Sequence, residues 1–167
     1  MRPKNNMLVQ EKTEKQVTRV DTHRLIKNCD IGKGTKIFYF VNMYGCKIGR
    51  NCMIGAFVEI QKGVKIGDGT RIQSHSFLCE GVEIGDNVFV GHGVVFANDM
   101  HPSIETWRDK TYKMEKTIVG NNASIGNNAT ILPGITIGES AVIGAGSVVT
   151  KNVPACATVV GNPGRAL

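Results

Sequence analysis

Aliphatic residues recur at every sixth position through most of this chain. One run covers residues 48–96 and a second covers residues 119–149. Ile, Leu and Val make up only 39 of the 167 residues, yet they occupy 14 of the 15 positions in the two runs. The positions are Ile48, Ile54, Ile60, Ile66, Ile72, Leu78, Ile84, Val90, Phe96, Val119, Ile125, Ile131, Ile137, Ile143 and Val149. A fixed period of six predicts a β-solenoid, because a helix repeats every 3.6 residues and a half-buried strand alternates every two.

The residues beside each aliphatic position fit a coil with tight corners. Gly follows the aliphatic residue at nine of the fifteen positions, and glycine accepts corner backbone angles that are closed to other residues. Each hexad then supplies a short strand whose aliphatic side chain points inward. Three hexads close one triangular coil and stacked coils bury a continuous core, so we expect an all-β solenoid of about six coils over residues 23–167.

The start of the repeat is less regular. The aliphatic position first recurs every six residues from Leu25 to Met43. The next step, from Met43 to Ile48, is one residue shorter. The slip falls in the aromatic stretch 38–45, which either fills a bulge in the first coils or lines a face on which a planar base or a sugar ring stacks. Residues 1–22 are polar and lack the repeat, so we expect an arm or a cap over the open edge of the first coil.

A long insertion interrupts the ladder. Phe96 and Val119 are 23 positions apart where one repeat needs six, so 17 residues are extra. Intact repeats flank this stretch, and residues 97–118 are therefore expected to leave one corner as a loop. Long loops on rigid scaffolds usually carry binding and chemistry, which makes His101 in this loop the first candidate for a functional side chain.

The net charge and the cysteine pattern indicate which classes of partner and which cellular compartment to expect. The net charge of +6 and the pI near 9.2 favour polyanionic partners such as phosphates. No basic run is interleaved with aromatic residues, so nucleic acid is not favoured. The five cysteines form no CxxC pair, which indicates a reduced, cytoplasmic compartment. We find neither a signal peptide nor an apolar run of about 20 residues, and expect no membrane span.

Three stretches of the chain resemble the hexapeptide-repeat acyltransferases, which fold as left-handed parallel β-helices. They are the hexads themselves, the loop FANDMHP at residues 96–102, and the tail VVTKNVP at 148–154 followed by GNPGR at 161–165. The resemblance implies acetyl-CoA as the donor. It also implies a homotrimer with three active sites in the clefts between neighbouring chains.

Within this family, the chain is most similar to bacterial N-acetyltransferases that act on an amino sugar carried by a nucleoside diphosphate. The long N-terminal repeat, the segment 72–74 and the Phe-Ala-Asn-Asp loop carry that likeness. The galactoside and maltose O-acetyltransferases are the alternative, since they have a catalytic histidine followed by proline where this chain has His101 and Pro102. We favour the N-acetyltransferase because the upstream solenoid is longer than the O-acetyltransferase branch requires. A non-enzymatic scaffold is the third and least expected alternative.

The resemblance also assigns acceptor-side residues. His101 is the candidate general base, because a sugar hydroxyl needs help to lose its proton and a neutral amine needs less. Asn98 corresponds to a loop asparagine that meets the substrate, and Gln73 to an amide near the acceptor, with a corner cap as the equal alternative for Gln73. His75 and His92 are 17 residues apart, so they are expected near one corner on adjacent coils, facing outward as further substrate-binding candidates.

Donor-side residues lie in the second half of the chain. Ala145, with Asn127 one coil earlier, would let pantetheine lie flat against a corner. Thr150, Lys151 and Arg165 match family positions that contact the phosphates of CoA, where a cation is most favourable. A zinc site like that of the γ-class carbonic anhydrases, which share this fold, needs two histidines five residues apart, and the sequence has no such pair near its loop, so no metal is expected.

Overall fold

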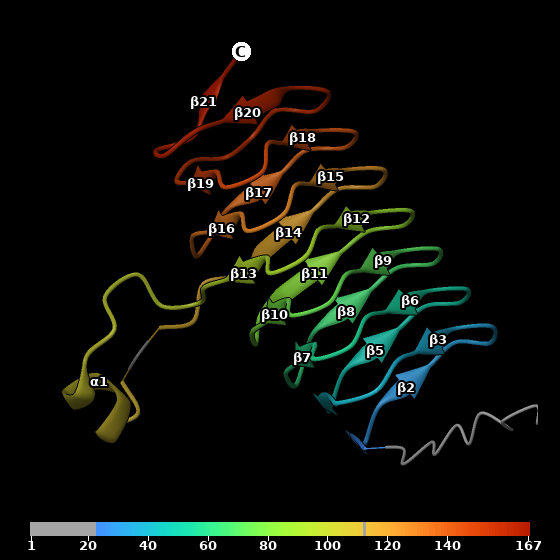
Figure 1. The fold of residues 1–167 in the computed structure, drawn as a ribbon. Coiled ribbons are helices and arrows are strands. Elements are labelled where there is room, and N and C mark those ends of the chain that lie inside the picture. Colours follow the sequence, from blue (N-terminus) through green and yellow to red (C-terminus); the bar gives the residue numbers. More distant parts are fainter. Residues whose placement is uncertain (1–22, 112) are drawn as a thin grey trace, which may run out of the picture.

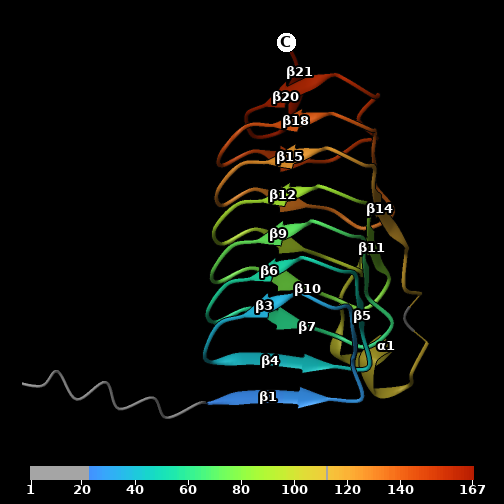
Figure 2. The same ribbon diagram turned by 90° about the vertical axis from the view of Figure 1, so that its right-hand side faces the viewer.

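The computed structural model describes residues 23–111 and 113–167 as a stack of triangular coils (Figures 1 and 2). The expected arm or cap at residues 1–22 lies outside the described residues. Sheet A contains β1 (Arg24–Lys27), β4 (Val41–Tyr44), β7 (Glu59–Ile60), β10 (Phe77–Leu78), β13 (Val95–Phe96), β16 (Thr130–Ile131) and β19 (Val148–Val149). Sheet B contains β2 (Asp30–Ile31), β5 (Lys47–Ile48), β8 (Lys65–Ile66), β11 (Val82–Ile84), β14 (Thr117–Val119) and β17 (Thr136–Ile137).

Sheet C completes the prism and closes its C-terminal end. It contains β3 (Lys36–Ile37), β6 (Met53–Ile54), β9 (Arg71–Ile72), β12 (Phe89–Val90), β15 (Ser124–Ile125), β18 (Val142–Ile143), β20 (Thr158–Val160) and β21 (Arg165–Ala166). The strands pair in parallel with the next coil, and β21 turns back to pair antiparallel with β20. This confirms the predicted all-β parallel solenoid and is consistent with the left-handed β-helix of the resembled family.

The chain passes from sheet A to B, from B to C, and from C to A in every coil, which defines three corners. We call them the A–B, B–C and C–A corners. The insertion leaves after β13 and returns at β14, so it lies at the A–B corner. The five-residue helix α1 (Ile104–Arg108) belongs to this insertion. Figure 1 shows α1 outside the stack of coils.

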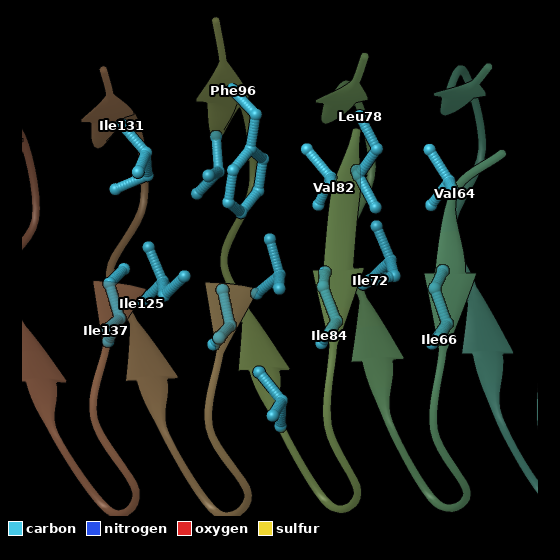
Figure 3. Close-up of a cluster of buried hydrophobic side chains, with 14 of the residues drawn as sticks. Val64, Ile66, Ile72, Leu78, Val82, Ile84, Phe96, Ile125, Ile131 and Ile137 are labelled. Carbon is cyan, nitrogen blue, oxygen red and sulfur yellow. The ribbon is translucent and has the colours of Figure 1, made fainter. Parts of the chain in front are cut away.

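The hexad residues fill the interior as vertical ladders. Leu78, Phe96 and Ile131 follow one another in sheet A, and each is fully buried. Figure 3 shows them side by side on successive coils. Burying one such side chain is worth roughly 1.5–3 kcal/mol relative to leaving it in water. Repeating that gain on each coil gives the continuous core that the period predicts.

The register of the first coil differs from the prediction. Leu25 is 63% exposed, while Ile26 pairs with the buried Met43. The first residue in the inward register is therefore Ile26, five positions before Ile31, although Ile26 is itself 38% exposed at the start of the stack. Leu25 and Ile26 are adjacent and both aliphatic, so the six-residue pattern alone could not choose between them.

The aromatic stretch does not fill a bulge in the interior. Phe38 and Phe40 lie outside the core, 45% and 51% exposed. Inward positions of this region are taken by Val41 and Met43, which are buried. The alternative interpretation, an outward-facing aromatic surface, is the one that the geometry favours.

Two of the cysteines contact each other between the first coils. The Sγ atoms of Cys29 and Cys46 are 3.3 Å apart, and burial raises the pKa of the Cys46 thiol to about 12. Cys52 is buried, and Cys29 is half-buried against the core. The structure thus uses these thiols as small apolar side chains.

No helix in the described part of the chain is long and apolar enough to cross a membrane.

Candidate functional site

One group of predicted site residues meets at the C–A corner. His75 and His92 are exposed there on adjacent coils, since the Gly93 amide donates to the carbonyl of Ser74 at 3.0 Å. Gln73 is half-buried beside His75, at a place where four other coils have glycine. The 17-residue spacing of the two histidines thus predicted their neighbourhood correctly.

The two small-corner candidates continue the same edge toward the C-terminus. Asn127 lies one coil beyond His92, and its side-chain oxygen accepts from the His92 amide at 2.9 Å. Ala145 follows one coil later, where the Gly146 amide donates to the Asn127 carbonyl at 2.8 Å. Both residues are exposed. The C–A corner therefore forms an edge on which Asn127 and Ala145 carry short side chains. Backbone N–H and C=O groups follow one another along this low-relief edge from coil to coil.

The insertion carries a second group at the A–B corner. Its two stems are tied together by Asn98, whose carbonyl accepts from the Glu115 amide at 3.2 Å. The Asn98 side-chain amide donates to the carbonyl of Glu80 at 3.4 Å, so this residue also fixes the loop to the coil below. Ser103 caps α1 by accepting from the Thr106 amide. Every residue of α1 lies outside the core.

His101 lines a pocket within the insertion. The pocket has a volume of about 250 Å³ and is lined by Asp99, Met100, His101, Thr106, Thr111, Lys113 and Glu115. The Asp99 carboxylate accepts from the His101 amide at 2.8 Å, which closes a tight turn and fixes the start of the His101 side chain. Sequence reasoning did not select Asp99, Lys113 or Glu115, because their convergence depends on how the loop folds back.

An ion-pair network holds the C-terminal stem of the insertion on sheet B. Glu83 bonds Lys116 at 2.8 Å and Lys65 at 2.9 Å. These two ammonium groups, Lys116 first, lower the pKa of the Glu83 carboxyl. The network is on the surface, so its role is to position the stem more than to stabilise the fold.

The third group lies at the C-terminal end of the prism. Thr150, Lys151 and Arg165 line one pocket of about 300 Å³. Arg165 arrives there because β21 folds back against β20, and the reversal depends on Gly164. A Cβ at Gly164 would meet Val159 and the carbonyl of Val148. The fold-back of β21 therefore brings the cation of Arg165 beside Thr150 and Lys151.

Within one chain these three groups do not form a single site. His101 and Asn98 lie at the A–B corner, whereas Gln73, His75, His92, Asn127 and Ala145 lie at the C–A corner. Among residues 23–111 and 113–167, no group of three or more His, Cys, Asp or Glu side chains is placed to hold a metal ion.

Comparison with known proteins identifies the repeat. The model of the bacterial transferase hexapeptide (six repeats) matches residues 45–80 and 116–151, and the model of the hexapeptide repeat of succinyl-transferase matches residues 74–96. Together these matches cover more than half of the chain. It belongs to the hexapeptide-repeat transferases.

Individual relatives match most of the chain. The bifunctional protein GlmU of Acetivibrio thermocellus is 37% identical over 131 residues, which is 78% of this chain but only 26% of GlmU. A hexapeptide-repeat acetyltransferase of Vibrio cholerae, solved with acetyl-CoA, is 26% identical with a TM-score of 0.62, over 80% of this chain and 69% of that one.

A third similar structure shares the fold along nearly its whole length. It is a point mutant of AntD, an N-acyltransferase from Bacillus cereus, in complex with dTDP and coenzyme A. Its TM-score is 0.73 over 84% of this chain and 82% of AntD, at 24% identity. At that identity the likeness concerns the fold alone.

Proposed function

We propose that this hexapeptide-repeat protein is an acetyltransferase that moves the acetyl group of acetyl-CoA to the amine of a nucleotide-linked amino sugar. The observation that carries the proposal is the C-terminal pocket of Thr150, Lys151 and Arg165, at the end of the prism toward which the small-residue C–A corner leads. Cations there match the phosphates of CoA. The low-relief edge past Ala145 and Asn127 matches an extended pantetheine arm, whose amide groups need backbone partners.

The chemistry requires few protein groups. A neutral sugar amine attacks the thioester carbonyl, and the bond from carbon to sulfur breaks. The nitrogen gives one proton to a base, and a proton passes from that base to the departing sulfur, so that CoA leaves as the thiol. His101 is the proposed base, held by its backbone bond to Asp99. Asn98, Gln73 and His92 are proposed to orient the acceptor. Most of the rate then comes from holding the two reactants in line.

A sugar O-acetyltransferase is the second candidate. The observation in its favour is the exposed His101, followed by Pro102, because a hydroxyl is a much weaker nucleophile than an amine and depends on a base. The same donor pocket serves both reactions. The two candidates differ in the bond that forms, an amide or an ester.

We further propose that the working unit is a homotrimer in the cytoplasm, acting in the synthesis of a sugar for a cell-surface glycan. His101 and the C–A corner of one chain lie on different edges of the prism. Packing copies side by side would bring the insertion of one chain to the C–A corner of the next. Sedimentation equilibrium measures the mass, and a monomer with full activity would contradict this assembly.

The donor pocket makes a prediction about Arg165. Replacing Arg165 with Ala should raise the KM for acetyl-CoA about tenfold, because one charge-assisted contact to a phosphate is lost. The KM for acetyl-dephospho-CoA, which lacks the 3′-phosphate, should change much less. Initial rates with both donors measure the difference. An equal rise with both donors would show that Arg165 does not contact the 3′-phosphate.

A further inference from the structure

Four rings form a ladder along the first coils of the C–A corner. His23, Phe40, Phe57 and His75 stack face to face, with centroid distances of 5.7, 5.0 and 4.9 Å and interplanar angles of 14°, 6° and 9°. We call these four residues the aromatic ladder. It lies on the outside of the prism, and Phe57 is 52% exposed. The stacked faces cover one another, so it is mainly the ring edges that meet the solvent.

The backbone under the ladder is strained. Phe40, Phe57 and His75 have φ values of 60°, 60° and 65°, a left-handed conformation that bulky residues rarely adopt. The matching places on the other corners are taken mainly by Gly and Asn, at Asn28, Gly45, Gly63, Gly81, Gly134, Gly34, Asn51, Gly69, Asn87 and Asn122. Strain of this kind gathers at functional sites. The ladder is therefore a feature that the fold supports against local preference.

The ladder stops where a ring is missing. The next coil has Gly93 at the ladder position, with φ of 66°, so the imidazole of His75 has Phe57 on one face and the bare Gly93 backbone toward the other. In the described part of the chain, no ring is stacked on that second face. A fifth ring stacked on His75 at the centroid distance of the other pairs would lie on the coil of Gly93, beside the Gly93 backbone.

The rim of this position is polar. His92 precedes Gly93, and the amide of Asn128 leans toward Gly93 from the following coil, where it would meet an added Cβ. Gln73 lies on the His75 coil. Asn127, on the proposed path of pantetheine, is one coil away. A ring seated here would have the face of the His75 imidazole beneath it and amide and imidazole groups around it, one coil from the proposed path of pantetheine.

We propose that this position, the Gly93 slot, is the subsite for the sugar ring of the acceptor, which stacks its C–H face on the His75 imidazole. The inference rests on the proposed function and specifies where the acceptor lies. Sugar C–H groups carry slight positive charge and suit the negative face of an aromatic ring. The amine and hydroxyls then point outward to Asn128, Gln73 and His92, with the amine one coil from the thioester path.

Filling the slot with a protein ring tests the proposal. Gly93→His would continue the ladder, since Phe40, Phe57 and His75 already carry rings at this backbone conformation. Gly69 is a matched control at the B–C corner, because it has φ of 68° and its Cβ would meet the Asn87 amide as that of Gly93 meets Asn128. We expect Gly93→His to raise the acceptor KM at least about tenfold and Gly69→His to leave it within about twofold. Equal effects of the two variants would overturn the subsite.

His75 variants separate stacking from proton transfer. His75→Phe keeps a ring on the ladder, so the acceptor KM should stay within about threefold, while His75→Ala should raise it about tenfold with the KM for acetyl-CoA unchanged. Thermal unfolding of both variants shows whether the ladder still supports the corner. A loss of kcat in His75→Phe equal to that in His75→Ala would assign His75 to proton transfer and overturn the stacking role.

Binding measured without turnover distinguishes this inference from the proposed function. Saturation-transfer NMR with methyl glucosaminide should show signal on the sugar C–H protons for the wild type, Gly69→His and His75→Phe, and none for Gly93→His. UDP serves as the second probe. Loss of the uracil signal in Gly93→His, with the sugar signal kept, would mean that the slot takes a base and would overturn the proposal. Absence of sugar signal in the wild type would overturn it as well.

Discussion

Replacing His101 with Ala is expected to lower kcat by roughly 10²–10⁴, with little change in the KM for acetyl-CoA. General base catalysis is worth about this factor, and none of the residues that line the proposed donor pocket belongs to the insertion. Steady-state rates of CoA release, measured with a thiol reagent, give both constants. A fall in kcat with unchanged donor KM is the signature of a group that acts only in the transition state.

Arg108→Ala is the matched control for this experiment. Arg108 is exposed on α1 in the same insertion, but does not line the His101 pocket. The kcat of the Arg108→Ala variant should remain near that of the wild type. A loss under about fivefold in His101→Ala would contradict the base role, and the amine would then lose its proton to water.

Replacing Phe96 with Ala is expected to lower the free energy of unfolding by about 3–5 kcal/mol. Phe96 is fully buried between Leu78 and Ile131 in neighbouring coils, and truncation removes its burial and leaves a cavity in a rigid ladder. It also ends β13, the strand from which the insertion departs. Urea denaturation monitored by circular dichroism measures the change.

Phe89→Ala provides the comparison on the outer face of sheet C. Phe89 is 39% exposed, so its removal should cost under about 1.5 kcal/mol. Similar losses in the two variants would mean that the interior ladder is not the main source of stability.

The fold could be predicted from the sequence because each coil repeats a local rule. A buried aliphatic residue followed by a corner glycine marks the strand and its end, and stacking makes the global structure a sum of neighbouring coils. The rule failed at Leu25 and Ile26, where two adjacent aliphatic residues satisfy it equally. The rule also could not decide whether the aromatic residues around Phe40 fill a bulge or face outward, since outward positions are not constrained by the core.

The candidate site was predictable only in part. The pairing of His75 with His92 follows from the coil length, and so does the Asn127 to Ala145 edge. The aromatic ladder was missed because its first steps, from His23 to Phe40 and from Phe40 to Phe57, are 17 residues and the next, to His75, is 18. The contact between Asp99 and His101 was not predicted, because an irregular insertion has no repeat from which contacts can be inferred.

Acetyl transfer to a panel of acceptors is the most direct test of the proposed N-acetyltransferase activity. Purified protein is given acetyl-CoA with amino-sugar nucleotides on UDP, dTDP and GDP, and separately with plain glycosides, and CoA release is followed together with product mass. We predict turnover with at least one amino-sugar nucleotide, and a product that resists hydroxylamine because the new bond is an amide. Turnover only with glycosides, giving a hydroxylamine-labile ester, or no turnover with any acceptor, would contradict it.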